Sequence, residues 1–497
     1  MEGGPDVTRR VPVLPLSLDE LGPFIGSERL AAFMDVSERA RDALAGRVLV
    51  HVNSTSTGGG VAEMLPTLLG YARGSGIDAK WRVVTGEPEF FAVTKRLHNR
   101  IHGEPGDGGP LGPDERRVYD EVLAGNAGDL LTTLRAGDIA VLHDPQTLGL
   151  APLLHRIGVI TVWRSHIGRD TANPTTDQAW AFLRPYLQDV DRFVFTRADY
   201  RPDCIPGERV RIIMPSLDPL STKNRAMAEP DVKSVLAFTG LIDGDPSVAP
   251  PFFLRRDGSP ARLERRADVV QLGPPVPPDE PLVVQVSRWD RLKDMTGVMV
   301  GFADHVATTG PGHLILAGPN VSGVSDDPEG AADLESCIRT WRSLPHSARQ
   351  RIHLACLPVA DVEENAVIVN ALQRHAGVVV QKSLAEGFGL TVLEAMWKGR
   401  PIVASGIGGI RDQVIDGESG LLLDDPSDLP QFGRLVRQLL NDPARASDLG
   451  TSAAQRAAQF LPDLHLTKWA TLLTEVAPTT PAPSPSLSPG SSTISSK

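Results

Sequence analysis

The sequence is poor in cysteine and contains no long apolar run. Its three cysteines (Cys204, Cys337 and Cys356) are widely spaced and form no C-x-x-C pair. This excludes a disulfide framework and a zinc site built from cysteine alone. No stretch approaches the roughly 18 apolar residues that a membrane helix needs, and the start of the chain lacks the cleavage pattern of a signal peptide. We therefore expect a cytoplasmic protein with no membrane partner.

Positive charge is also scarce, because 61 acidic side chains oppose 50 basic ones and give a formal net charge of −11. Such a surface repels phosphate backbones, so we expect no nucleic-acid partner. Any phosphate that the protein binds must be met by a few locally placed cations.

Several common catalytic motifs are missing. No Walker A sequence, no G-x-G-x-x-G after a strand and no G-x-S-x-G is present. The Asp243-Gly244-Asp245 string resembles a manganese-binding D-x-D, but it lies in a proline-rich stretch with no strand before it, so we interpret it as chance. His353 and Cys356 lack further ligands at metal spacing. We expect no metal site and no cofactor.

Short β-branched runs alternate with helical stretches along most of the 497 residues, a pattern typical of parallel sheets with crossover helices. The sequence predicts two facing, doubly wound Rossmann-like α/β domains with a cleft between them. The expected strands are Arg47–Asn53, Ala79–Thr85, Asp138–Asp144, Val159–His166 and Arg192–Thr196 in the first domain, and Leu282–Arg288, His313–Gly318, Ile352–Leu357, Gly377–Lys382 and Pro401–Ser405 in the second.

We place the first domain at residues 1–215 and the second at 216–460, followed by a helix at 461–476. The stretch from Pro215 to Pro281 is predicted to connect the domains and extend the edge of the second one. Residues 477–497 contain fifteen Pro, Ser or Thr, a composition that predicts a disordered tail.

The first candidate site is the loop Asn53–Glu63, which follows the first predicted strand and contains Gly58, Gly59 and Gly60. Three glycines between a strand and a helix let backbone N–H groups approach an anion near the positive end of the helix dipole. A flexible turn without a ligand is the alternative.

A second candidate is Arg288 and Lys293 in SRWDRLK, just after a predicted buried strand. A planar guanidinium and a compact ammonium in one strand-to-helix loop suit a diphosphate, although solvated surface charge is the alternative.

A third candidate, after the strand Gly377–Lys382, reads SLAEGFGLTVLEA and opens a helix at Gly387 and Gly389. Its free N–H groups could meet the same diphosphate. Glu386 and Glu394 would lie roughly 12 Å apart in a helix, too far for a hydrolase carboxylate pair. They better suit hydroxyls at two ends of one long ligand.

These strings resemble the retaining, nucleotide-sugar-dependent glycosyltransferases of the GT-B type. E-x7-E joined to R-x4-K is the most specific part of the likeness. HVNSTSTGGGVAEML, EFFAVTKRLHNRIHG, HDPQTLGL, WRSHIG, AWAFLRPYL and MPSLDPLSTKN also resemble the trehalose glycosyltransferring synthases. The resemblance runs from about Asn53 to Asp442. It implies transfer of glucose from ADP- or UDP-glucose to free glucose, giving α,α-trehalose.

The resemblance also implies roles. On the donor side, Arg288 and Lys293 would neutralise the diphosphate and Glu386 would bind glucose hydroxyls. The remaining donor contacts would come from Gly58, Gly59, Gly60, Gly387, Phe388, Gly389, Leu390 and Glu394, with Glu394 on the ribose.

On the acceptor side, the resemblance places His166 beneath the donor sugar near the anomeric carbon, with Asp144 and Gln146 reaching the acceptor. A buried strand-end histidine and a turn aspartate are the alternatives from the residues alone. Retention would come from front-face attack, in which the departing phosphate oxygen takes the proton of the acceptor.

Three other functions stay open at this point. They are a sugar-nucleotide-binding regulator, a dinucleotide oxidoreductase and a transferase of the same fold with another small sugar or polyol acceptor. The intact cations and glutamates argue against the first, and the missing G-x-G-x-x-G argues against the second. Fold does not fix the acceptor, so the third is the main alternative. Whether the protein forms a homodimer is left open.

Overall fold

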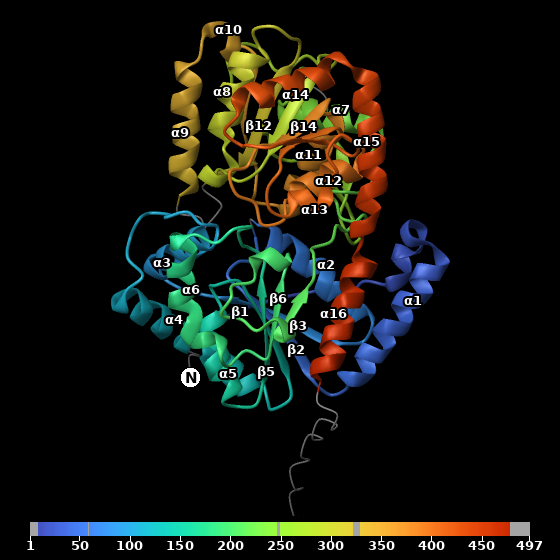
Figure 1. The fold of residues 1–497 in the computed structure, drawn as a ribbon. Helices are drawn as coiled ribbons and strands as arrows, with labels where there is room; N and C mark the ends of the chain where they lie inside the picture. Colours follow the sequence, from blue (N-terminus) through green and yellow to red (C-terminus); the bar gives the residue numbers. More distant parts are fainter. Residues whose placement is uncertain (1–7, 58, 246–248, 322–328, 478–497) are drawn as a thin grey trace, which may run out of the picture.

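Two doubly wound sheets, one in each half of the chain, organise the protein, as predicted, and each has seven strands. The computed structural model describes residues 8–57, 59–245, 249–321 and 329–477 (Figure 1). Gly58 and the predicted disordered tail beyond Ala477 lie outside the described residues.

The first sheet has the strand order β1-β3-β2-β4-β5-β6-β7 and is parallel except for β1. Strands β2 to β6 confirm the five predicted ones. The short edge strands β1 and β7 were not predicted. The bounds are β1 Thr8–Val11, β2 Val48–Asn53, β3 Asp78–Val84, β4 Ile139–His143, β5 Ile160–Ser165, β6 Arg192–Phe195 and β7 Val210–Ile212.

Helices cover both faces of this sheet because successive strand residues point to opposite sides. One face packs against α1, α2 and α16, and the other against α3 to α6. The bounds are α1 Gly22–Ala43, α2 Gly60–Gly74, α3 Pro88–Ile101, α4 Pro113–Thr133, α5 Ala151–His155, α6 Pro174–Leu187 and α16 Pro462–Val476.

The second sheet has the order β10-β13-β12-β11-β14-β15-β16, and only its edge strand β10 is antiparallel to its neighbour. All five strands predicted here are confirmed, whereas β10 and β16 were not predicted. The bounds are β10 Asp268–Val270, β11 Leu282–Val286, β12 His313–Pro319, β13 Ile352–Leu357, β14 Val378–Gln381, β15 Ile402–Ser405 and β16 Leu421–Leu423.

The helices of the second half are arranged in the same doubly wound way around its sheet. Those placed on its two faces or at its ends are α7 Glu229–Thr239, α8 Met295–His305, α9 Gly330–Ser343, α10 His346–Arg349, α11 Val362–His375, α12 Leu390–Trp397, α13 Ile410–Gln413, α14 Leu429–Asn441 and α15 Pro443–Ala457. The connection predicted between the sheets contains α7, the hairpin β8 (Phe252–Leu254) and β9 (Pro260–Arg262), and the edge strand β10, so it does extend the second sheet.

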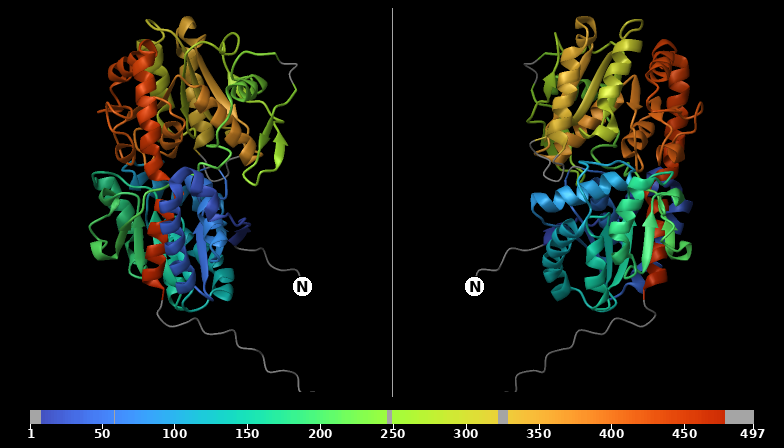
Figure 2. Two further views of the ribbon diagram at one scale, coloured as in Figure 1. Left: turned by 90° about the vertical axis from the view of Figure 1, so that its right-hand side faces the viewer. Right: turned by 60° about the vertical axis from the view of Figure 1, so that its left-hand side comes forward.

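The last helix, α16, returns to the first half of the chain and lies beside α1 (Figures 1 and 2). Arg29 of α1 donates to both carboxylate oxygens of Asp463, at 2.9 and 2.8 Å. The two lobes stack one above the other, with the carboxyl ends of their parallel strands toward each other (Figure 2). Each helix in the described part of the chain is too short or too polar to span a lipid bilayer.

Candidate active site

A cleft with a volume of about 730 Å³ lies between the two lobes. Its walls include the ends of β2 and β4 and the loop after β5 in the first lobe, and the ends of β11, β12 and β13 and the loop after β14 in the second. Doubly wound sheets bind their ligands outside the carboxyl ends of the strands, so both lobes present their binding edges here. A volume of this size suits a ligand of several rings.

Arg288 and Lys293 both line the cleft on the loop after β11. Lys293 belongs to a short 3-10 turn, η5 (Arg291–Lys293), which Asp290 caps by accepting the N–H of Leu292 at 2.8 Å. Because β11 and β14 are neighbours in the sheet, this loop lies beside the one that carries Glu386. The structure thus places the three residues on neighbouring loops of the cleft.

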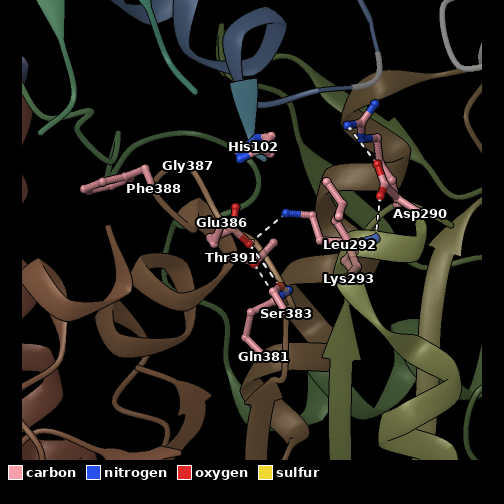
Figure 3. A network of polar contacts seen from close by, with 12 residues as sticks. His102, Asp290, Leu292, Lys293, Gln381, Ser383, Glu386, Gly387, Phe388 and Thr391 are labelled. Atoms are coloured by element: carbon pink, nitrogen blue, oxygen red, sulfur yellow. Dashed lines mark hydrogen bonds and ion pairs between the residues drawn. The ribbon is translucent and has the colours of Figure 1, made fainter. Parts of the chain in front are cut away.

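Glu386 forms the central contact between these two loops (Figure 3). Its Oε2 lies 2.7 Å from Lys293 Nζ and accepts a hydrogen bond from Ser383 Oγ at 3.2 Å. Both interactions hold the carboxylate at the start of α12. His102 of the first lobe points toward this pair from the opposite side of the cleft (Figure 3).

The glycine loop before α12 allows the two lobes to approach closely. A Cβ on Gly387 would lie 2.6 Å from the carbonyl oxygen of His166, and Gly389 has a φ of +88°, which side chains disfavour. Phe388, Gly389 and Leu390 line the cleft, where α12 begins. The first N–H groups of a helix have no carbonyl one turn earlier, so they are available to an anion.

Glu394, one turn into α12, is a buried carboxylate that borders the cleft. Its Oε1 lies 3.6 Å from Lys223 Nζ, whereas Oε2 is buried without a hydrogen-bond partner in the described part of the chain. Burial raises the pKa of Glu394. An unpartnered buried oxygen costs stability unless a ligand hydroxyl donates to it, so this atom fits a ribose contact.

Gly59 and Gly60 line the first-lobe side, opposite α12. A Cβ on Gly60 would lie 3.1 Å from Leu390 Cδ1, so the glycine loop contacts the start of α12 across the cleft. The prediction for Gly58 falls outside the described residues.

Asp144, His166 and Gln146 also line the cleft. Asp144 follows β4 with a φ of +61°, and its Oδ1 accepts the backbone N–H of His166 at 2.7 Å. Burial raises the pKa of Asp144 to about 7. The carboxylate therefore holds the His166 loop in place as well as facing the cleft.

The His166 ring stacks on His143, with centroids 5.2 Å apart and an interplanar angle of 12°. Burial is the main cause that lowers the pKa of both imidazoles well below the ordinary value. Both rings are therefore neutral near pH 7.

Helix α3 and the residue that caps its end contribute polar side chains that the sequence analysis did not single out, namely Lys95, His98 and His102, all of which line the cleft. They lie three and four residues apart and so share one face of the helix. That spacing inside EFFAVTKRLHNRIHG was the available signal. His102 Nδ1 donates to the carbonyl of Gly168 at 3.1 Å, and burial lowers the pKa of His102 to about 4.

Asp290 joins the two lobes and was likewise not predicted as a site residue. Its Oδ2 lies 3.3 Å from Lys95 Nζ and 3.6 Å from Arg288 Nη2. Burial alone would raise the pKa of Asp290, but the charges of Lys95 and Arg288 hold it well below the ordinary value. The carboxylate stays ionised between the two cations.

No cluster of His, Cys, Asp and Glu suited to a metal ion occurs among the described residues. Asp243, in the D-x-D string, lies in the connection after α7 and its oxygen accepts only the N–H of the next residue, Gly244, in the contacts that the structure gives it. Neither Asp243 nor Asp245 lines the cleft.

Comparison with known proteins identifies two matching family models. Residues 51–202 match the trehalose synthase N-terminal domain, and residues 363–456 match the group 1 glycosyl transferases. Each segment contributes residues to one wall of the cleft.

Full-length relatives agree. A trehalose synthase of Thermococcus litoralis is 33% identical over 459 residues, which cover 92% of this chain and 96% of the relative. A trehalose synthase of Rubrobacter xylanophilus is 33% identical over 84% of this chain and 89% of its own length.

A solved structure of a trehalose-6-phosphate protein from E. coli, bound with UDP-2-fluoro glucose, has the same fold with a TM-score of 0.63. It is 14% identical, and the match covers 86% of this chain and 99% of that one. The fold is thus GT-B, and the chain belongs to the trehalose synthase family of glycosyltransferases.

Proposed function

We propose that the protein transfers glucose from a nucleotide-glucose, such as ADP- or UDP-glucose, to free glucose and forms α,α-trehalose with retention of configuration. The observation that carries this proposal is the arrangement of Lys293, Glu386 and the start of α12 directly across the cleft from His166. It combines a site for a leaving diphosphate with a carboxylate for sugar hydroxyls.

On the donor side, Arg288, Lys293 and the N-terminus of α12 would neutralise the diphosphate. A guanidinium, an ammonium and free backbone N–H groups suit phosphate oxygens. Glu386 would bind hydroxyls of the transferred glucose. Glu394 would accept a ribose hydroxyl through its unpartnered Oε2.

On the acceptor side, Asp144 and Gln146 would hold free glucose from the first lobe, near His166. A small polyol needs several hydrogen bonds at once to be oriented, and the cleft offers a carboxylate and an amide there. Orientation of two bound reactants is itself a large catalytic contribution.

The chemistry would be a front-face displacement. The bond from the anomeric carbon to the phosphate oxygen breaks, and a bond to the acceptor oxygen forms on the same face. The acceptor's hydroxyl proton passes to the departing phosphate oxygen. Protein cations stabilise the charge that develops on the diphosphate, so no metal is required.

A transferase of the same fold with another small sugar or polyol as acceptor is the alternative. The two are separated by measuring release of nucleoside diphosphate from a panel of nucleotide-glucoses, with and without glucose, other hexoses and polyols. The proposal expects release that depends on glucose. Release that depends only on another acceptor would support the alternative.

A further inference from the structure

Three buried histidines form a hydrogen-bonded row, which we call the histidine chain: His51, His143 and His166. His51 Nδ1 lies 2.9 Å from His143 Nε2, and His143 Nδ1 lies 2.9 Å from His166 Nε2. His166 and His143 line the cleft, and His51 does not. His51 packs against Trp469 of α16, with ring centroids 6.0 Å apart.

The register of the sheet creates this row. β2, β4 and β5 are adjacent, His51 pairs with Val141, and His143 pairs with Arg164. Each histidine is therefore two residues further toward the carboxyl end than the one on the preceding strand. Residues two apart share a face of the sheet, so all three side chains lie on the face covered by α1, α2 and α16.

The hydrogen bonds of the histidine chain determine which ring nitrogens can carry the protons. The pKa of His51 is lowered to about 3, mainly by burial, and those of His143 and His166 are lowered well below the ordinary value for the same reason. A neutral imidazole has one N–H and one lone pair. His143 must therefore donate to one neighbour and accept from the other, so all protons point either toward His51 or toward His166.

Arg164 selects between these two directions. Its Nε lies 3.5 Å from His166 Nδ1, in a long hydrogen bond. A guanidinium can only donate, so His166 Nδ1 carries the lone pair and Nε2 carries the proton. His143 then donates from Nε2 to His51, and His51 carries its own proton on Nε2.

We infer that His143 and His51 are positioning residues that hold His166 in one tautomer, with its lone pair on Nδ1, and in one ring orientation. The inference rests on the proposed function, in which the transferred sugar lies over His166. Positive charge develops at the anomeric carbon in transfers of this kind. An uncharged ring does not repel that charge, whereas an imidazolium would.

The tautomers can be read directly from nitrogen-15 NMR spectra of histidine-labelled protein, without substrate. The inference predicts the Nε2–H form for all three members of the chain. A proton on Nδ1 of His166 would overturn it. If the wild-type protein forms no trehalose, the proposed function fails while this measurement still decides the inference.

The activity test uses His143→Phe, which keeps a ring stacked on His166 but removes both nitrogens. By analogy with partners that orient ligand histidines, kcat should fall roughly 10–100-fold with little change in the KM for the donor. Without the 2.9 Å bond to His143, only the long 3.5 Å contact from Arg164 favours the Nε2–H form, so the His166 signals should shift toward a mixture. A folded His143→Phe protein with wild-type kcat would contradict the inference.

His353→Phe is the matched control. His353 Nε2 lies 3.0 Å from His313 Nδ1 in the second lobe, and these rings stack 5.3 Å apart. The same substitution there breaks a similar pair outside the cleft, so kcat should stay at the wild-type value. Should His143→Phe fail to fold, His51→Phe breaks the chain at its far end, and a wild-type kcat in that variant would overturn the inference.

Discussion

Lys293 Nζ lies 2.7 Å from Glu386 Oε2, so the cation expected to meet the diphosphate and the carboxylate expected to meet the sugar are already paired. The two residues lie on loops after neighbouring parallel strands, β11 and β14. Each therefore holds the other at the start of α12 before a ligand arrives. Preorganised charge of this kind is effective because little reorganisation is needed during the reaction.

Replacing Lys293 by alanine should lower kcat by roughly 10²–10³, by analogy with the loss of an oxyanion-hole donor. Arg288→Ala should behave similarly. Lys233→Ala is the control, because Lys233 pairs with Glu229 on the surface of α7 and lies outside the cleft. Steady-state kinetics on folded proteins check this. Near wild-type turnover in both cleft variants would place the diphosphate elsewhere.

Glu394→Gln should raise the dissociation constant for the donor about 10–100-fold, which corresponds to the loss of a charged hydrogen bond worth about 1.5–3 kcal/mol. The variant should be no less stable than the wild type, because burial, which raises the pKa of Glu394, disfavours the charged carboxylate more than Lys223 stabilises it. Calorimetric titration with the nucleoside diphosphate measures the affinity. Unchanged affinity would remove Glu394 from the ribose contact.

Asp144→Asn should increase stability at neutral pH and reduce transfer. The ordinary pKa of Asp is 3.8, and burial raises that of Asp144 to about 7 in the folded protein. Between these values the folded state binds the extra proton, so the contribution of this group to stability falls as pH rises from about 4 to about 7. Asparagine has no buried charge to form as the pH rises, and its side-chain oxygen can still accept the His166 N–H.

The measurement is the free energy of unfolding of both proteins at several pH values. The advantage of the Asp144→Asn variant over the wild type should grow from pH 4 to pH 7 and then level off. A constant difference would show that Asp144 does not titrate in this range. Glucose transfer should be impaired more than donor binding if Asp144 orients the acceptor.

Transfer should persist in excess EDTA, because Arg288, Lys293 and the start of α12 are expected to meet the charge of the leaving group. Product formation after dialysis against EDTA checks this. Complete loss of activity that manganese or magnesium restores would mean that a metal ion carries part of that charge.

The sequence predicted the central strands because they are buried on both faces and consist of β-branched runs, such as β2 and β14. It did not predict the edge strands. β1 reads TRRV and β7 reads VRI, and such short, half-polar segments become strands only when a neighbouring strand offers hydrogen bonds. That neighbour is determined by the tertiary fold.

The same distinction applies to the cleft. Arg288, Lys293 and Glu386 could be placed from sequence because each follows a recognisable strand. The contact of Lys223 with Glu394, the bridge from Lys95 to Asp290 and the histidine chain depend on strand order and register. Residues that far apart along the chain carry no mutual signal in one sequence.

The most direct test of the account uses glucose labelled with carbon-13 at C1 as the acceptor, an unlabelled nucleotide-glucose as the donor, and NMR of the product. The account predicts that the labelled carbon becomes part of a non-reducing α,α-1,1 linkage, with no reducing-end signals in the disaccharide. A reducing disaccharide, or a product that contains no labelled glucose, would contradict it.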